Sequence, residues 1–238
     1  MELGNGIWAL GDESWGRVRS FLVVEEDGLT VIDTLGDEHP FTILAAIRSI
    51  GRSISDLRRI WLTHAHFSHL AGLAALKELS GATVGAHRWE ADIIAGERKA
   101  QRVPILPRRP LKAYYPFQFG LAFGLSKGDH KPCKVDTFLT DRHKSEGGKL
   151  NVLHIPGHTP GHLAFWTKDE DGRCILLAGD AIVTWPYFAG GWDSFTLNKR
   201  QQRISLRKMA RLAPDAVGVG HGEPITENAA EHLRSLVY

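Results

Sequence analysis

The chain has 238 residues, of which 43% are hydrophobic and 24% are charged, and its formal net charge is +2. This composition is ordinary for a globular protein, and the length suits one large domain, which we expect over residues 1–238. The small net charge argues against nucleic acid as a partner. No apolar run approaches the roughly 20 residues that span a bilayer, and residues 1–15 lack the basic and apolar regions of a signal peptide. We therefore expect no membrane partner and a cytoplasmic location.

The first part of the chain predicts strands, followed by helices and strands in alternation. Apolar runs separated by glycine-containing turns predict strands at residues 6–10, 18–25 and 29–33. Apolar spacing predicts an amphipathic helix at 41–50, a buried strand that ends at Leu62, a helix at 70–79, a strand at 82–86 and a helix at 87–95. This order indicates a layered α/β architecture in which helices pack against the faces of sheets.

Residues 96–130 interrupt this pattern with four prolines and a run of aromatic residues between Tyr114 and Phe123. Such a long segment without periodicity is uncommon inside a domain and often forms a lid or a binding loop. Its aromatic side chains could instead pack on the body of the protein or form the surface of a homodimer. We expect an insertion or lid at about this position.

Order returns after the insertion. Apolar runs predict strands at 135–139, 150–155, 163–167, 173–177 and 217–219. A helix is predicted at 197–212, with Leu197 and Ile204 on its apolar line, and a closing helix at 226–237, with Thr226 as its N-cap.

The most informative stretch is Thr63-His64-Ala65-His66-Phe67-Ser68-His69, directly after the buried strand that ends at Leu62. Neutral imidazole is the commonest protein ligand for a transition metal. Side chains on extended chain alternate with a period of two, so His64 and His66 can point the same way. His69 follows after a turn and can face a second position. The stretch therefore predicts metal ligands at the end of a strand.

Further polar side chains follow other predicted strands, next to glycine or proline. His158 lies in Pro156-Gly157-His158-Thr159-Pro160-Gly161-His162, Asp180 follows Gly179, and His221 follows Gly220. Sites in layered α/β folds gather at the carboxyl ends of strands, and imidazole and carboxylate ligands suit zinc, iron or manganese. We expect His162 to be a structural residue or to orient a neighbouring ligand, and not to bind the metal itself. Asp33 either orients one of the histidines or forms a turn. The candidate metal ligands are His64, His66, His69, His158, Asp180 and His221.

In their order along the chain, these motifs resemble those of the metallo-β-lactamase-fold hydrolase superfamily, whose signature is Thr-His-x-His-x-Asp-His at a strand end. The resemblance implies a four-layer αββα sandwich, with two mixed sheets between helices and a metal site along one edge. It also implies zinc, one or two ions per chain. His64, His66 and His158 would bind the first metal, His69 and His221 the second, and Asp180 would bridge them.

The chain departs from that signature at Ser68, where the family has an aspartate that binds the second metal. Serine is neutral, shorter and rarely a zinc ligand. Three interpretations stay open. The second metal still binds through the remaining ligands, or the site holds a single zinc or iron ion, or hydrolysis is lost and the pocket only binds a ligand.

The resemblance and the ligands together predict a metal-dependent hydrolase of a small-molecule substrate. A metal-bound hydroxide would attack a small ester, lactone or thioester. Asp180 and Ser68 are the predicted catalytic residues, with Ser68 at most a hydrogen-bond donor to that water. The alternatives are an iron-dependent oxygenase of the kind that oxidises persulfides and a non-catalytic ligand-binding protein on the same fold. Few residues follow His221, so we do not expect the helical substrate-binding domain of glyoxalase II enzymes.

Overall fold

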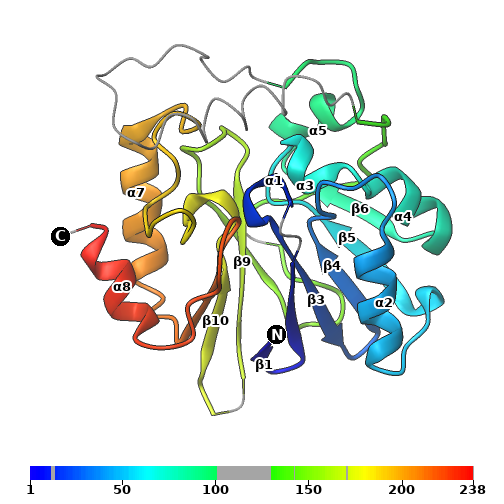
Figure 1. Ribbon diagram of the computed structural model, residues 1–238, viewed down its shortest axis with the longest axis horizontal. Helices are drawn as coiled ribbons and strands as arrows, with labels where there is room; N and C mark the ends of the chain where they lie inside the picture. The colour runs from blue at the N-terminus through cyan, green and yellow to red at the C-terminus, as the bar shows by residue number, and fades with distance from the viewer. Residues whose placement is uncertain (12–13, 101–129, 142, 170, 238) are drawn as a thin grey trace.

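The computed structural model describes residues 1–11, 14–100, 130–141, 143–169 and 171–237. Its strands form two mixed sheets of seven and four strands. The sheets lie between two sets of helices, with α2 and α4 outside one sheet and α7 and α8 outside the other (Figure 1). The predicted αββα sandwich is therefore confirmed.

The seven-stranded sheet follows the chain order of its strands, β1 to β7. The first four strands are antiparallel neighbours, and β4 to β7 are parallel neighbours. Gly28 (φ +145°) begins β4 after a tight turn, where a Cβ atom would lie 2.5 Å from the Asp56 carbonyl oxygen, so only glycine fits. The strands are β1 (Glu2–Gly4), β2 (Ile7–Gly11), β3 (Arg19–Glu25), β4 (Gly28–Ile32), β5 (Leu57–Trp61), β6 (Thr83–Ala86) and β7 (Thr137–Phe138).

The four-stranded sheet has the order β11-β10-β9-β8. Its β10 runs parallel to β11 and antiparallel to β9, which is antiparallel to β8. The strands are β8 (Asn151–His154), β9 (Leu163–Lys168), β10 (Cys174–Leu177) and β11 (Ala216–Gly218).

The helices differ in length and in place. The longer ones are α2 (Phe41–Ser49), α4 (Leu73–Ser80), α5 (Arg88–Ile94), α7 (Lys199–Ala210) and α8 (Ala229–Ser235). The short ones are α1 (Ser14–Arg17), η1 (Ile54–Asp56), α3 (Phe67–Leu70) and η2 (Gly179–Ala181), and the last two lie at strand ends.

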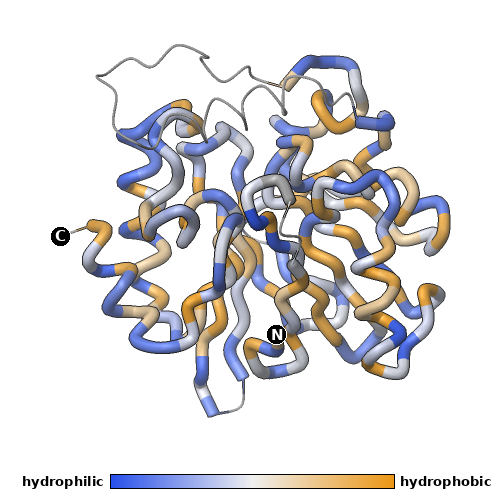
Figure 2. The backbone as a smooth tube through the Cα atoms, in the orientation of Figure 1, coloured by the Kyte–Doolittle hydropathy of each residue, from blue (hydrophilic) through white to orange (hydrophobic). Residues whose placement is uncertain are grey.

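Alternation along the strands produces a core in each of the three spaces between layers. In β9, Leu163 and Phe165 belong to the core between the sheets, whereas Ala164 faces the core beneath α7 and α8. In β3, Leu22 faces the core beneath α2 and α4. The strands are accordingly hydrophobic along most of their length, while hydrophilic residues dominate the outer turns of α7 and α8 (Figure 2).

Several predicted boundaries need correction. The helix predicted at 70–79 begins only at Leu73, as α4, and Leu70 ends the separate short helix α3. Gly72 lies between the two helices, and a Cβ atom built on it would lie 2.8 Å from the Thr34 carbonyl oxygen. The closing helix begins at Ala229 with Asn228 as its N-cap, so the cap at Thr226 was wrong. The first boundary is set by a close backbone approach at Gly72 and the second by the left-handed backbone of Asn228 (φ +49°), and the pattern of apolar residues contains neither.

The apolar line predicted for the helix at 197–212 is also wrong. Leu197 is 45% and Ile204 is 57% exposed, and the buried residues of α7 are Gln202, Ser205, Leu206 and Met209. Of the predicted insertion at 96–130, residues 101–129 lie outside the described part of the chain. No helix in the described part is both long and apolar enough to cross a membrane.

Candidate metal centre

The structure brings all six predicted ligands together at one edge of the sandwich. The segment after β5 carries His64 and His66 on a loop and His69 in α3. The loop after β8 carries His158, η2 after β10 carries Asp180, and the loop after β11 carries His221. They form two clusters, in each of which the candidate ligand atoms lie within 4.8 Å of one another. The first cluster is His64, His66, His158 and Asp180, and the second is His69, Asp180 and His221.

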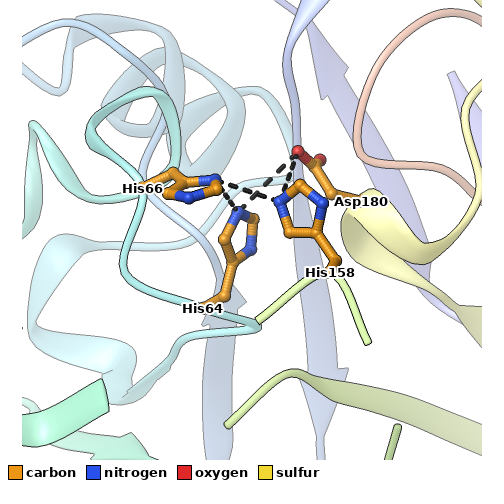
Figure 3. Close-up of side chains that lie close together, drawn as sticks. All are labelled: His64, His66, His158 and Asp180. Carbon is orange, nitrogen blue, oxygen red and sulfur yellow. Dashed lines mark hydrogen bonds and ion pairs between the residues drawn. The ribbon is translucent and has the colours of Figure 1, made fainter. Parts of the chain in front are cut away.

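The first cluster is drawn in Figure 3, where three imidazole rings and one carboxylate turn toward a common point. His66 Nδ1 lies 3.0 Å from both His64 Nε2 and His158 Nε2. Asp180 Oδ2 lies 3.7 Å from His64 Nε2 and 3.4 Å from His158 Nε2. In a tetrahedral zinc site with bonds of about 2.0–2.1 Å, ligand atoms are roughly 3.3 Å apart. The spacing of these four atoms therefore suits a tetrahedral metal ion.

The second cluster uses the other oxygen of the same carboxylate. Asp180 Oδ1 lies 3.0 Å from His69 Nε2 and 3.5 Å from His221 Nε2, and the two imidazole nitrogens are 3.3 Å apart. Asp180 thus presents Oδ2 to the first cluster and Oδ1 to the second. This is the geometry of a carboxylate that bridges two metal positions.

Buried polar atoms around Asp180 lack the partners that burial requires. Asp180 is 3% exposed, and among the described residues its Oδ1 accepts no hydrogen bond of good geometry, although His69 Nε2 and His221 Nε2 lie 3.0 Å and 3.5 Å from it. A buried carboxylate is costly unless it is paired or coordinates a metal. The donor set and the orphaned oxygen therefore fit a divalent cation.

Protonation differs between the clusters. Burial, with the neighbouring histidines, lowers the pKa of His64 and His158 well below the ordinary value, and burial lowers that of His66 to about 4. These three rings are therefore neutral and offer lone pairs. Burial opposes the charged form of His69 as well, yet Asp180 and Asp33 raise its pKa to about 10. Without a metal, His69 holds a proton at neutral pH.

A second layer of contacts orients the ligands. Asp33 Oδ2 lies 2.9 Å from His69 Nδ1, and it accepts from Thr63 Oγ1 at 2.7 Å. Thr63 Oγ1 lies 2.9 Å from His64 Nδ1, and the Gly16 carbonyl oxygen lies 2.9 Å from His221 Nδ1. Of the two interpretations of Asp33, this contact supports the one in which it orients a histidine.

Two buried side chains that the sequence did not single out connect the ligand loops. Glu90 on α5 contacts the loop of His64 and His66 and the loop of His158. Gln202 on α7 accepts from the His158 backbone N–H at 3.0 Å and donates to the Ala181 carbonyl oxygen at 2.9 Å. Each lies on a predicted helix, where a polar residue normally faces water, so the sequence pattern indicated neither.

Three further residues lie near the clusters, and two of them, Ser68 and His162, were singled out from the sequence. Ser68 is 2% exposed in α3, one residue before His69. His162 stacks on His64 with ring centroids 4.9 Å apart, and it belongs to neither cluster. Trp192 packs on His221 with centroids 4.4 Å apart and forms a small core with Val183 and Phe195. The free, buried Cys133 and Cys174 form no disulfide.

Comparison with known proteins identifies the family. Residues 14–221 match the sequence family described as "Metallo-beta-lactamase superfamily", so the chain belongs to this superfamily of hydrolases. It is 27% identical over 236 residues to the uncharacterized protein YobT of Bacillus subtilis, covering 92% of this chain and 89% of that protein. It is 29% identical to the probable metallo-hydrolase YflN of Bacillus subtilis, covering 71% of this chain and 66% of the relative.

Other relatives are longer. A hydroxyacylglutathione hydrolase of Ruegeria pomeroyi is 28% identical, covering 76% of this chain and 53% of that protein, so the chain spans about half of its length. Among solved structures, a metallo-β-lactamase of Cronobacter sakazakii superposes with a TM-score of 0.71 at 21% identity, covering 99% of this chain and 92% of the other. A metallo-β-lactamase family protein of Thermus thermophilus gives 0.69 at 23% identity, covering 99% and 79%. These likenesses show the fold.

Proposed function

We propose that the chain is a hydrolase with two metal ions, most simply zinc, that cleaves a small ester, lactone or thioester. The observation that carries this proposal is the placement of Asp180, whose two oxygens face two separate sets of imidazole nitrogens. Imidazole and carboxylate ligands at these spacings suit zinc. A small-molecule substrate fits an edge site of this kind.

The ligands divide the work between the two positions. Zinc supplies a Lewis acid that polarises a carbonyl and lowers the pKa of a bound water to about 7. His64, His66 and His158 are neutral and can hold the first ion without losing a proton. His69 must give up its proton before it can hold the second, and Asp180 remains ionised because His221 and His69 hold its pKa well below the ordinary value despite burial.

Ser68 changes the second position without removing it. His69, His221 and Asp180 already lie within 4.8 Å of one another, which supports the interpretation in which the second metal binds through these three. In place of the family carboxylate, Ser68 would offer a neutral hydroxyl. Its proposed role is to donate a hydrogen bond to water in the site.

The substrate class is supported by the relatives. Several are named hydroxyacylglutathione hydrolase, which favours a thioester among the three bond types. The relative YflN is named only a probable metallo-hydrolase, and the proposal therefore extends to esters and lactones.

The test is a hydrolysis panel with matched metal states. Nitrophenyl esters, lactones and acyl thioesters of increasing chain length are assayed with protein that is zinc-loaded, chelator-treated, or chelator-treated and reloaded. We expect turnover on at least one bond type that disappears on chelation and returns with zinc. Background rates on the whole panel with two zinc ions bound would refute the proposal. Oxygen consumption with a persulfide by iron-loaded protein would point to the oxygenase instead.

A further inference from the structure

Glu90 is a buried carboxylate that belongs to neither metal cluster. It lies in the first turn of α5 and is 1% exposed. A carboxylate is expensive to bury unless hydrogen-bond donors surround it. Glu90 takes no part in the proposed reaction. The positions of its hydrogen-bond donors therefore indicate its role.

All three donors come from the loops that carry the first cluster. Glu90 Oε2 accepts from the Ala65 backbone N–H at 3.1 Å, and Ala65 lies between His64 and His66. Glu90 Oε1 accepts from Thr159 Oγ1 at 2.5 Å and from the Gly161 backbone N–H at 3.0 Å. Thr159 directly follows His158. One carboxylate therefore joins the two loops that supply the three histidines of the first cluster.

The loop that carries His158 has a glycine, Gly161, where the Glu90 carboxylate approaches its backbone. A Cβ atom built on Gly161 would lie 2.7 Å from both Glu90 Cγ and Oε1. Any larger residue would push Glu90 away from its donors. Gln202 on α7 accepts from the His158 backbone N–H, so side chains from two helices, α5 and α7, contact the loop that carries His158.

We propose that Glu90 is a positioning residue for the first metal, which fixes the distance between His64 and His66 on one loop and His158 on the other. Glu90 touches neither the metal nor the substrate in this role. It preorganises three imidazole nitrogens that lie on two separate loops. The inference rests on the metal binding of the proposed function and not on the reaction itself.

Glu90→Gln is the sharpest variant, because it keeps the shape and removes one acceptor. If the amide oxygen takes the place of Oε1, the amide nitrogen faces the Ala65 N–H, and in the opposite orientation it faces the Gly161 N–H. In either case one backbone donor loses its partner. The variant is made in a His221→Ala background, which leaves only the first cluster complete.

The measurements are zinc affinity, by competition with a chromophoric chelator, and the visible spectrum of the cobalt-loaded protein. Outer partners of metal ligands typically change affinity by about 10–100-fold, and we expect a loss in that range together with a changed cobalt spectrum. Glu25→Gln in the same background is the matched control. Glu25 is also buried, and it contacts Thr30, Ser145 and Arg59, away from both clusters.

The control separates positioning from stability. Glu25→Gln should lower the melting temperature yet keep zinc affinity within roughly threefold of the parent, as expected for a site remote from the metal. Parent-like affinity and spectrum in Glu90→Gln would overturn the proposal, as would an equal loss in Glu25→Gln. If Glu90→Gln does not fold, it is replaced by Thr159→Val, which removes only one hydrogen bond to Glu90. We expect Thr159→Val to lower the affinity for zinc, and an affinity equal to that of the parent would refute the proposal. These readouts need no substrate, so a failure of the hydrolysis panel would leave them interpretable.

Discussion

Replacing Asp33 with asparagine should weaken metal binding while leaving the backbone in place. Asp33 is 1% exposed and has a positive φ of 60°, a conformation that asparagine also tolerates. Its Oδ1 accepts from the Thr63 backbone N–H at 2.8 Å, and its Oδ2 faces Thr63 Oγ1 and His69 Nδ1. Asparagine can keep the first contact, but its amide nitrogen would meet the two donors at the second.

The substitution should weaken metal binding because it changes which ring nitrogen of His69 carries a proton. His69 can bind a metal through Nε2 only if Nδ1 carries the proton, which Asp33 accepts. Facing an amide nitrogen, His69 would favour the opposite tautomer, with its proton on the metal-facing nitrogen. Thr63 passes the same constraint to His64, because its hydroxyl donates to Asp33 and can then accept from His64 Nδ1.

The expected magnitude is a loss of about 10–100-fold in affinity for the second metal, or about 1.4–2.7 kcal/mol. The first metal should be affected less, because it depends on Asp33 only through Thr63. Stepwise zinc affinities from chelator competition measure both. Asp27→Asn is the control, because Asp27 is ion-paired with Arg59 and lies outside both clusters. Two unchanged affinities in Asp33→Asn would refute this account of ligand orientation.

Three further predictions concern the same site. Ser68→Asp restores a carboxylate to the second position, and isothermal titration should show tighter binding of the second metal; unchanged metal content would contradict the view of Ser68 as a missing ligand. Gln202→Leu removes the hydrogen-bond partners of the His158 N–H and the Ala181 carbonyl oxygen. Because each buried unpaired group costs about 1–3 kcal/mol, urea unfolding should show a loss of stability of at least that order. An unfolding midpoint like that of the parent would show that other groups replace these contacts. Because the pKa of metal-free His69 is raised to about 10, binding of zinc at pH 7 should release about one proton from this side chain. Calorimetry in buffers of different ionisation enthalpy measures the released proton. A binding enthalpy that does not depend on the buffer would argue against a protonated His69. The raised pKa of His69 also makes the stability of the metal-free protein depend on pH. Protonated His69 contributes its full stabilisation below pH 6.5, and this contribution is lost as the pH rises toward 10.

The candidate metal ligands could be singled out from the sequence because each lies in a short local motif. His64 and His66 are two residues apart at the end of an apolar strand, and Asp180 and His221 each follow a glycine. The fold then brings strand ends to one edge, as it does in layered α/β proteins generally. Local pattern and general topology together sufficed for these residues.

The residues that hold the ligands in place were not predictable in this way. Glu90 and Gln202 act across more than 20 residues of sequence, and their role depends on which loop their helix happens to face. In α7 the side that faces the site loops is partly polar, so Gln202 and Ser205 are buried there while Ile204 is exposed. A rule that places apolar residues inside fails at such a helix, because its buried face satisfies backbone groups of the loops.

Metal stoichiometry tests the central claim most directly. Elemental analysis of the parent protein and of His221→Ala, each purified without added metal and then reconstituted with zinc, counts the ions that each chain retains. Because His221 faces only the second cluster, the account predicts about two ions per chain for the parent and about one for the variant. One ion in both proteins would contradict the bridging role of Asp180, and no retained metal in the parent would contradict the metal centre altogether.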